Sequence, residues 1–478
     1  MRVFSRGVLA LALGLSGCTS GSEPDDRQVV CPPRGDSPGA PGVGDPLFPS
    51  LGNGGYDVSH YSLDLDVDPA RNRLSAVVDI EASATQTLTS FNLDFAGPSI
   101  RQVTVNDAAV SFCRDEGELT IVPADALRAG ASFQVSVSYA GSPRPFMRPG
   151  PPGRSAHGWT QISEEQVSAG GLWGVESVFF PGNATNRDKA TFLIRVTVPR
   201  PLGVAATGEL VDTVEHDGST TYVWKSDVPT PTSRIYFTTG PLDRERQEGP
   251  LGLVIENLFP PGTPVELRSD LESAGPIIEA LSGFFGPFPF DTLGFTWVPG
   301  APEETAIGAH GRIFILNLPR LGERDLAHEI GHQWFGNSVT PASSQDDWLS
   351  EGFATYAESL WTEHVLGPEH RDTVPATWLG RLGDRTRPLA KVAAPEELGD
   401  YVTYFRGAAT LHALRLEVGD RSFFRILRRY ATDFRHASAT TDDFIAMAEA
   451  VTGQDLTELF DAWLYHEAVP VIRELGSP

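Results

Sequence analysis

The first half of the chain alternates apolar and polar residues with a period of two. In the stretch SLDLDVD, Leu63, Leu65 and Val67 alternate with aspartates, and the stretches FQVSVSY and TFLIRVTV repeat the pattern. Such alternation is typical of antiparallel strands that bury one face. The sequence therefore predicts an all-β domain over residues 55–241.

The period lengthens to that of a helix from about residue 265, beginning with DLESAGPIIEALSGFFG. Between this segment and residue 323, LGFTWVP and GRIFILNL indicate two short strands. Further helices, several separated by Gly or Pro, are predicted over residues 323–335, 350–366, 404–418, 421–435, 441–452 and 455–465. Residues 242–478 are therefore predicted to form an α+β, mainly helical domain, and the fold class is multidomain, antiparallel β followed by α+β.

The N-terminus, MRVFSRGVLALALGLSGCTS, joins a positively charged start to an apolar run that is too short to span a bilayer. The run ends in Leu15-Ser16-Gly17-Cys18, which resembles a bacterial lipobox. The resemblance implies a signal peptide over residues 1–17, cleavage before Cys18 and a lipid on Cys18. An ordinary secretory signal is the alternative. We expect a protein of the bacterial cell envelope, lipid-anchored and facing the periplasm or the cell exterior.

Residues 18–54 are rich in Gly, Pro, Ser and Asp, which predicts a flexible tether between the lipidated cysteine and the β domain. Cys31 lies in this tether and Cys113 in the β domain. In an exported protein these two thiols either form one disulfide or stay free.

The chain has 37 Lys and Arg residues against 62 Asp and Glu residues, and its formal net charge is −25. This excess of negative charge argues against nucleic acid or an anionic lipid surface as a partner. Contact with a membrane is expected only through the lipid on Cys18.

The stretch ERDLAHEIGHQWFGN carries the chemistry that the sequence indicates most clearly. His328 and His332 are four residues apart, so on a helix their imidazoles project from one strip and can hold one Zn²⁺. Glu329 lies beside them, where a base can reach a water activated by the metal. A solvated helix face with two histidines is the alternative interpretation.

A third ligand is available 19 residues after His332, where Glu351 begins a second predicted helix in DDWLSEGFATYAES. Two histidines and a glutamate leave the fourth tetrahedral position open, as in catalytic rather than structural zinc sites. Glu358 lies two turns later and either orients a ligand histidine or stays on the surface. We expect one Zn²⁺ per chain.

Several stretches together resemble the gluzincin zinc aminopeptidases, the aminopeptidase N and leukotriene hydrolase group. They are H-E-x-x-H followed by E-G-F-A, NRDKATFLIRVTVP with TGEL, YVTYFRGAATLHALRLEVGD, and LFDAWLYHEAVPVI. The resemblance covers about residues 55–475 and implies a β-sheet N-terminal domain followed by a thermolysin-like catalytic domain. Longer members continue into a large C-terminal helical domain; the chain ends at Pro478, so a more open cleft is expected.

The resemblance also implies roles for single residues. His328, His332 and Glu351 bind zinc, Glu329 is the general base, and the Tyr404 hydroxyl stabilises the oxyanion. Ser350 and Arg406 stand where the family usually has Asn and Lys, and neither carries the chemistry.

The family motif that holds the substrate's amino terminus is altered here. Aligned without gaps, its five places are Gly300, Ala301, Pro302, Glu303 and Glu304. Glu303 then stands for the amine-binding glutamate, with Glu304 as the alternative if the loop shifts by one, and an acidic surface loop as the other interpretation. Candidates from the β domain are Gln161, Glu164 and Glu176.

The sequence thus predicts a lipid-anchored zinc aminopeptidase acting on peptides with a free N-terminus. Two alternatives stay open. One is a zinc endopeptidase with an open cleft, if the GAPEE loop neither blocks the cleft nor binds an amine. The other is a non-catalytic surface binding protein of the same fold, although such a protein has no need of Glu329.

Overall fold

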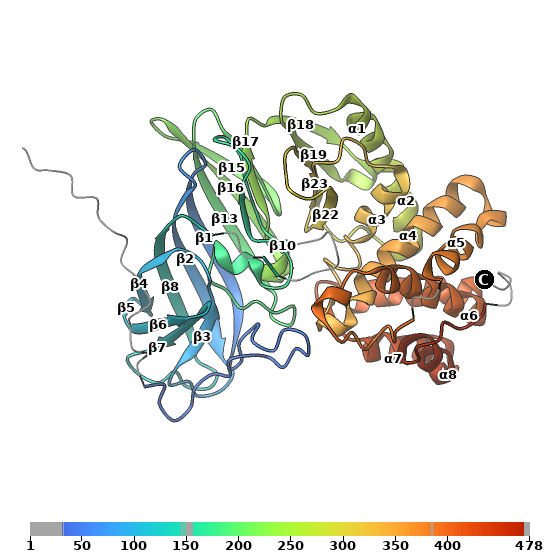
Figure 1. Ribbon diagram of the computed structural model, residues 1–478, viewed down its shortest axis with the longest axis horizontal. Coiled ribbons are helices and arrows are strands. Elements are labelled where there is room, and N and C mark those ends of the chain that lie inside the picture. The colour runs from blue at the N-terminus through green and yellow to red at the C-terminus, as the bar shows by residue number, and fades with distance from the viewer. Residues whose placement is uncertain (1–30, 32, 145–146, 149–155, 384–385, 473–478) are drawn as a thin grey trace, which may run out of the picture.

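The computed structural model describes residues 31, 33–144, 147–148, 156–383 and 386–472. The predicted signal peptide and Cys18 lie outside the described residues. The β-rich half of the chain and the helical half lie side by side, which confirms the predicted fold class (Figure 1). Among the described residues, no helix combines the length and the apolarity needed to cross a bilayer.

An eight-stranded sheet, in the order β15-β16-β13-β1-β2-β8-β4-β5, forms the body of the β domain. Its strands are β1 (Tyr56–Asp68), β2 (Arg73–Ala84), β4 (Ser99–Val105), β5 (Ala108–Ala109), β8 (Ser132–Gly141), β13 (Ala190–Pro199), β15 (Glu209–Glu215) and β16 (Ser219–Thr230). Leu63, Leu65 and Val67 of β1 are buried, as their alternation predicts. The pairing is antiparallel throughout except between β1 and β13, which run parallel.

Smaller sheets complete this domain. One has the order β3-β7-β6, a second β11-β12-β17-β14, and a third pairs β9 with β10. The strands are β3 (Phe91–Asp94), β6 (Ser111–Asp115), β7 (Glu118–Val122), β9 (Met147–Arg148), β10 (Ala156–His157), β11 (Trp159–Gln161), β12 (Val167–Ala169), β14 (Gly203–Ala206) and β17 (Phe237–Gly240). The hydrophobic core of the domain continues across the boundary to Phe314 and Leu316 of the next sheet.

The second domain opens with a mixed sheet in the order β18-β19-β21-β23-β22, which leaves β22 at an edge. Its strands are β18 (Asp243–Glu248), β19 (Val254–Phe259), β20 (Thr292–Leu293), β21 (Phe295–Val298), β22 (Thr305–Ala309) and β23 (Arg312–Leu316), and β24 (Thr340–Pro341) pairs separately with β25 (Ser438–Ala439). β21 and β23 are the two strands expected here.

The helices of this domain pack around a second core. The α-helices are α1 (Val265–Asp270), α2 (Ala274–Phe285), α3 (Glu323–Gly331), α4 (Trp348–Leu366), α5 (Thr373–Leu382), α6 (Gly407–Asp433), α7 (Thr441–Thr452) and α8 (Thr457–Phe460). Short 3₁₀ turns are η2 (Val175–Val178), η3 (Thr232–Arg234), η4 (Pro250–Gly252), η5 (Leu271–Ser273), η6 (Ser344–Asp346), η7 (Pro368–His370) and η8 (Pro395–Glu397), and π-helical turns are η9 (Val402–Arg406) and η10 (Asp461–Tyr465).

Residues 33–54 correct the prediction of a flexible tether, because they pack against the rest of the molecule. Cys31 forms a disulfide with Cys113, which resolves the pairing that the sequence left open. Phe48 and Leu51 are buried in a small cluster. The carboxylate of Asp45 accepts hydrogen bonds from the backbone and hydroxyl of Ser344. The low apolar content of the segment predicted a linker, because composition does not show that a few of its side chains pack against the rest of the protein.

The polar side chains of Lys189 and His310 join the β domain to the second domain. The ammonium group of Lys189 donates to the carbonyl oxygens of Asn337, at 3.3 Å, and Ser338, at 3.0 Å. The Nδ1 atom of buried His310 lies 2.7 Å from the hydroxyl of Ser226 and 2.9 Å from that of Thr230. These contacts help to fix the two domains against each other.

Candidate metal centre and its cavity

Helices α3 and α4 bring the three predicted ligands together. His328 lies on α3, His332 directly follows it, and Glu351 lies in the first turn of α4. The helices approach closely at Gly331, where an added Cβ would lie 3.0 Å from the Cβ of Ala357. A larger residue at position 331 would therefore push the ligand helix away from Glu351.

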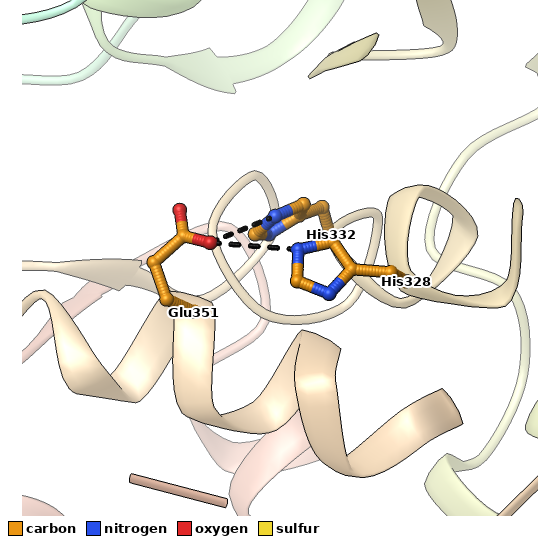
Figure 2. Close-up of side chains that lie close together, drawn as sticks. All are labelled: His328, His332 and Glu351. Carbon is orange, nitrogen blue, oxygen red and sulfur yellow. Dashed lines mark ion pairs between the residues drawn. The ribbon is translucent and has the colours of Figure 1, made fainter. Parts of the chain in front are cut away.

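The ligand atoms of these three residues converge on one point (Figure 2). The Nε2 atoms of His328 and His332 each lie 3.5 Å from Oε2 of Glu351, and one ligand atom from each residue lies within 4.8 Å of the others. Oε2 of Glu351 is buried and has no hydrogen-bond partner among the described residues. A buried carboxylate oxygen that faces two imidazole nitrogens fits a bound cation.

The outer nitrogens of both histidines are held by acceptors. Nδ1 of His328 lies 3.0 Å from a carboxylate oxygen of Glu358, and Nδ1 of His332 lies 3.1 Å from the carbonyl oxygen of Phe335. A carbonyl can only accept, so Nδ1 of His332 carries the proton and Nε2 presents its lone pair to the centre. The donor set is therefore that of a zinc site with room for a fourth ligand.

A cavity of about 440 Å³ opens onto this centre between the two domains. Glu329 lines it from α3, and Tyr404 lines it from η9. The Tyr404 ring stacks on the ring of His328, with centroids 5.6 Å apart. β22 crosses the same wall, because an added Cβ at Gly308 would lie 3.4 Å from Oε2 of Glu329.

The residues predicted to hold a substrate amine are divided between cavity and surface. Ala301, Glu303 and Glu304 line the cavity. Glu303 is half-buried, whereas Glu304 is exposed. Gly300 does not line it; this residue adopts a φ of 74° in a turn, and its N–H donates to Asn317.

The β-domain candidates lie away from the cavity lining. Gln161 donates to the carbonyl oxygen of Pro69, Glu164 is exposed, and buried Glu176 accepts a hydrogen bond from Thr232. The β domain contributes instead Gly170, Gly171, Trp173, Arg234 and Tyr236, none of which the sequence singled out. No local motif marks these positions.

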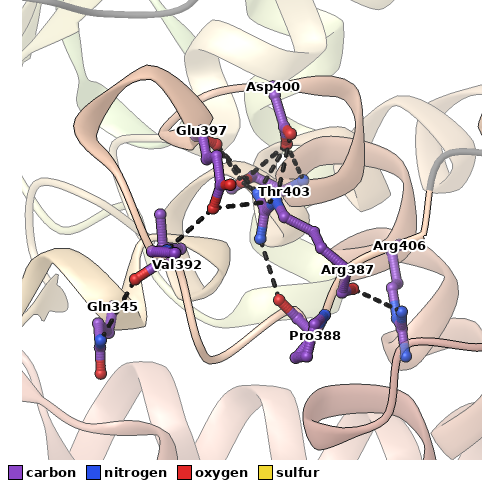
Figure 3. A network of polar contacts seen from close by, with 9 residues as sticks. Gln345, Arg387, Pro388, Val392, Glu397, Asp400, Thr403 and Arg406 are labelled. Atoms are coloured by element: carbon purple, nitrogen blue, oxygen red, sulfur yellow. Dashed lines mark hydrogen bonds and ion pairs between the residues drawn. The ribbon is translucent and has the colours of Figure 1, made fainter.

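A polar network orders the segment that leads to Tyr404 (Figure 3). The guanidinium group of Arg387 donates to the carboxylate of Asp400 at 2.7 Å and to the hydroxyl of Thr403 at 2.8 Å. The carbonyl oxygen of Asp400 then accepts from the backbone N–H of Tyr404 at 3.2 Å. Arg406 donates to the carbonyl oxygens of Trp463 and Glu467, so the departure from the family's lysine adds a structural anchor.

Comparison with known proteins identifies the family to which the chain belongs. Residues 323–463 match the model of the peptidase family M1 domain. An M1 zinc metallopeptidase from Deinococcus radiodurans is 32% identical, and the match covers 90% of this chain and 99% of that one with a TM-score of 0.83. The chain belongs to peptidase family M1. Since its structural relatives are zinc metallopeptidases and its own His-His-Glu site fits that ion, zinc is the metal of this M1 protein.

Curated M1 relatives are longer. A leucyl aminopeptidase from Saccharolobus solfataricus is 26% identical over 317 residues, which are 60% of this chain and 39% of that protein. Aminopeptidase M1 from Arabidopsis thaliana is 24% identical over 314 residues, 59% of this chain and 35% of that protein. The chain thus spans less than half the length of these relatives, whereas a two-domain M1 zinc metallopeptidase variant solved with L-tryptophan is matched over its full length, at 32% identity and a TM-score of 0.84.

Proposed function

We propose that the protein is a zinc aminopeptidase that removes residues from the N-terminus of peptides. The observation that carries the proposal is the half-buried carboxylate of Glu303, which lines the same cavity as the metal centre and Glu329. An α-amino group is largely cationic at neutral pH, and charge-assisted hydrogen bonds to a carboxylate are among the stronger ones. Relatives named as aminopeptidases support it, as does a solved M1 relative bound to Tyr-Ser-Ala.

The residues of the chain divide the reaction between them. When bound, zinc polarises the scissile carbonyl and makes water more acidic. The carboxylate of Glu329 takes a proton from the attacking water and passes it to the leaving amine. The hydroxyl of Tyr404 donates to the oxygen that gains negative charge, a contribution of about 10²–10³ in rate for one such donor. Glu303 fixes the ammonium group one residue from the scissile bond.

The experiment compares aminoacyl-coumarin amides that carry a free amino group with the same amides after N-acetylation. We expect hydrolysis of the free compounds and little of the acetylated ones, and Glu351→Ala should lose bound zinc and activity together. Internal cleavage of acetylated peptides at an equal rate would replace the proposal with the endopeptidase alternative. A loss of all hydrolysis with zinc still bound would favour a binding protein.

We also propose that a lipid on Cys18 anchors the protein to the bacterial cell envelope, with both domains facing the periplasm or the cell exterior. The lipobox-like sequence Leu15-Ser16-Gly17-Cys18 supports this location. Cys18→Ser should release the protein from the membrane fraction or block its processing, as fractionation of cells would show. An unchanged membrane fraction would indicate another attachment.

A further inference from the structure

A cation and an anion face the same end of the cavity, where the β domain meets α4. Arg234 ends η3 of the β domain, and Asp347 directly precedes α4. Both line the main cavity, and both also line an adjoining cavity of about 70 Å³, as do Leu172 and Trp173. These four residues therefore form the wall between the two spaces.

Arg234 is a buried residue whose guanidinium group has no partner among the described residues. The residue is only 9% exposed, and its Nε atom is buried without a partner. The described residues of the chain supply no hydrogen bond or ion pair to this guanidinium group. The Nε–H group is withdrawn from water without an acceptor, and an unsatisfied buried polar group costs about 1–3 kcal/mol, a charged group more. The cavity is the place from which an acceptor can come.

Asp347 supplies the balancing charge without contacting the arginine. Burial and then the charge of Glu351 raise the pKa of Asp347, whereas the charge of Arg234 lowers it. The two side chains thus lie close enough to interact through space, yet no direct ion pair between them is found among the described residues. Both side chains also line the main cavity, so one polar group bound there can contact the two.

This end of the cavity is connected to both parts of the proposed site. The charges of Arg234 and Glu303 both act on the pKa of buried Tyr236, which burial raises, so Tyr236 lies near both. An added Cβ at Gly336 would lie 3.5 Å from Nη2 of Arg234 and 3.1 Å from Nδ1 of His332. Glu303, the three metal ligands, Arg234 and Asp347 all line one cavity of about 440 Å³, which can hold the N-terminal residue of a bound peptide.

We propose that Arg234 and Asp347 form a specificity subsite for an N-terminal side chain that ends in a neutral group able both to donate and to accept hydrogen bonds. The phenol of tyrosine and the carboxamide of glutamine have this chemistry. Such a group accepts from Arg234, donates to Asp347 and leaves no net charge buried. This inference rests on the proposed aminopeptidase function.

Charged side chains fit the same subsite less well. A carboxylate satisfies Arg234 but faces Asp347, and an ammonium or guanidinium group satisfies Asp347 but faces Arg234, so each brings like charges together. Gly170 lines the same cavity, and an added Cβ there would lie 2.2 Å from the ring of Tyr236, so this glycine allows Tyr236 to pack into the cavity wall. A site built to hydrogen-bond a hydroxyl rejects the analogue that lacks it far more strongly than an apolar pocket rejects a missing methylene.

The experiment measures kcat/KM for tyrosyl- and phenylalanyl-coumarin amides, which differ by one hydroxyl. We expect tyrosine to be preferred by at least about tenfold, the effect of one hydrogen bond to a charged group, and Arg234→Met to bring the ratio near one. Arg200→Met, at an exposed arginine paired with Glu215, is the matched control and should keep the wild-type ratio. A wild-type ratio near one, or a ratio that Arg234→Met leaves unchanged, would overturn the subsite.

A second pair of substrates tests the balance of charge. Glutaminyl amide should be cleaved faster than glutamyl or lysyl amide, and Asp347→Asn should raise the glutamyl-to-glutaminyl ratio because Arg234 then stands alone. Preference of the wild-type protein for the glutamyl or the lysyl substrate would overturn the neutral subsite in favour of an anion or a cation site.

Binding separates this inference from the proposed function. Tyrosinamide should raise the melting temperature of the wild-type protein more than phenylalaninamide does, and that difference should vanish in Arg234→Met even if no substrate is hydrolysed. Hydrolysis of all amides without any preference would leave the aminopeptidase and remove the subsite. Equal shifts by the two amides would also remove the subsite.

Discussion

Glu329 is the proposed general base, and its proposed role is separate from that of the three metal ligands. Its carboxylate lines the cavity, while the ligand atoms come from His328, His332 and Glu351. Glu329→Gln keeps the size of the side chain and removes the base, so zinc should stay at about one ion per chain while turnover collapses. Metal analysis of the purified variant beside its kcat checks this. Loss of zinc together with activity would place Glu329 among the residues that hold the metal.

Tyr404 tests the stabilisation of the transition state. Its ring is already stacked on His328, so Tyr404→Phe should keep the ring in place and remove only the hydroxyl. We expect kcat to fall by about 10²–10³ with a smaller change in KM, because the oxyanion exists only late in the reaction. A kcat close to that of the wild type would exclude Tyr404 from the mechanism.

Glu303 and Glu304 offer a matched pair of neighbouring carboxylates. Glu303 is half-buried in the cavity wall and Glu304 is exposed. Loss of a charge-assisted hydrogen bond of about 1.5–3 kcal/mol should lower kcat/KM of Glu303→Ala by one to two decades for peptides with a free amino group. Glu304→Ala should do less, since water screens its charge. The reverse order of the two effects would shift the gap-free alignment of this loop by one residue.

Individual residues show where prediction from the sequence succeeds. His328, His332 and Glu351 follow from helical spacing and one short loop, and the structure brings them together. Arg234 and Asp347 line one cavity only because the β domain packs on the second domain, and no periodicity within either segment records that arrangement. For the same reason, the sequence could not show which β-domain residues line the cavity. The three candidates Gln161, Glu164 and Glu176 do not line it.

At the scale of elements, the helix positions were predicted better than their ends. The helix predicted over 323–335 ends as α3 at Gly331, and the chain then turns back through hydrogen bonds from residues 333–339. The two helices predicted over 404–418 and 421–435 form α6 with a break at Gly419, whose φ is 75°, after the π-helical turn η9. α5 was not predicted at all. Local turns that depend on tertiary hydrogen bonds leave a weaker signal than the apolar period does.

The contact between β16 and the turn after β22 should make stability depend on pH. Burial, followed by the charges of His436 and Lys189, lowers the pKa of His310 to about 3. The ordinary value is about 6.5, so as the pH falls below it the unfolded chain takes up a proton that the folded protein refuses. The stabilising contribution is thus complete above pH 6.5 and is lost toward pH 3, by up to about 1.4 kcal/mol per pH unit.

His310→Gln should therefore flatten the decline of the unfolding free energy between pH 6.5 and pH 4.5, measured by denaturant titration at several pH values. His216→Gln, at an exposed position, is the control and should keep the wild-type slope. The slope is the informative quantity, because the variant also loses the contacts with Ser226 and Thr230 at every pH. Equal slopes for the wild-type protein and His310→Gln would show that His310 is not the group that links this contact to pH.

At the scale of the whole molecule, residues 33–54 join both domains rather than trailing from one. The disulfide between Cys31 and Cys113 and the hydrogen bonds to Asp45 hold the segment at two points. After Asp45, Phe48 and Leu51 pack with Val392 and Leu398 of the catalytic domain. The composition predicted a tether here because a flexible linker and an ordered segment held by only a few contacts are both rich in Gly, Pro and Ser.

A substitution within residues 33–54 distinguishes a packed segment from a flexible tether. Leu51 is 7% exposed, and its side chain lies so close to Gly174 that an added Cβ there would be 2.6 Å from a Leu51 methyl. Leu51→Ala should lower the free energy of unfolding by about 2–4 kcal/mol, the usual cost of emptying a buried leucine site. Leu366→Ala, where the leucine is 53% exposed, is the matched control and should change stability by less than about 0.5 kcal/mol. Since Leu51 also lines the small cavity behind Arg234 and Asp347, its loss should weaken the preference for tyrosyl over phenylalanyl substrates. Equal unfolding midpoints for Leu51→Ala and the wild-type protein would restore the flexible tether, since a side chain in a solvated linker has no packing to lose.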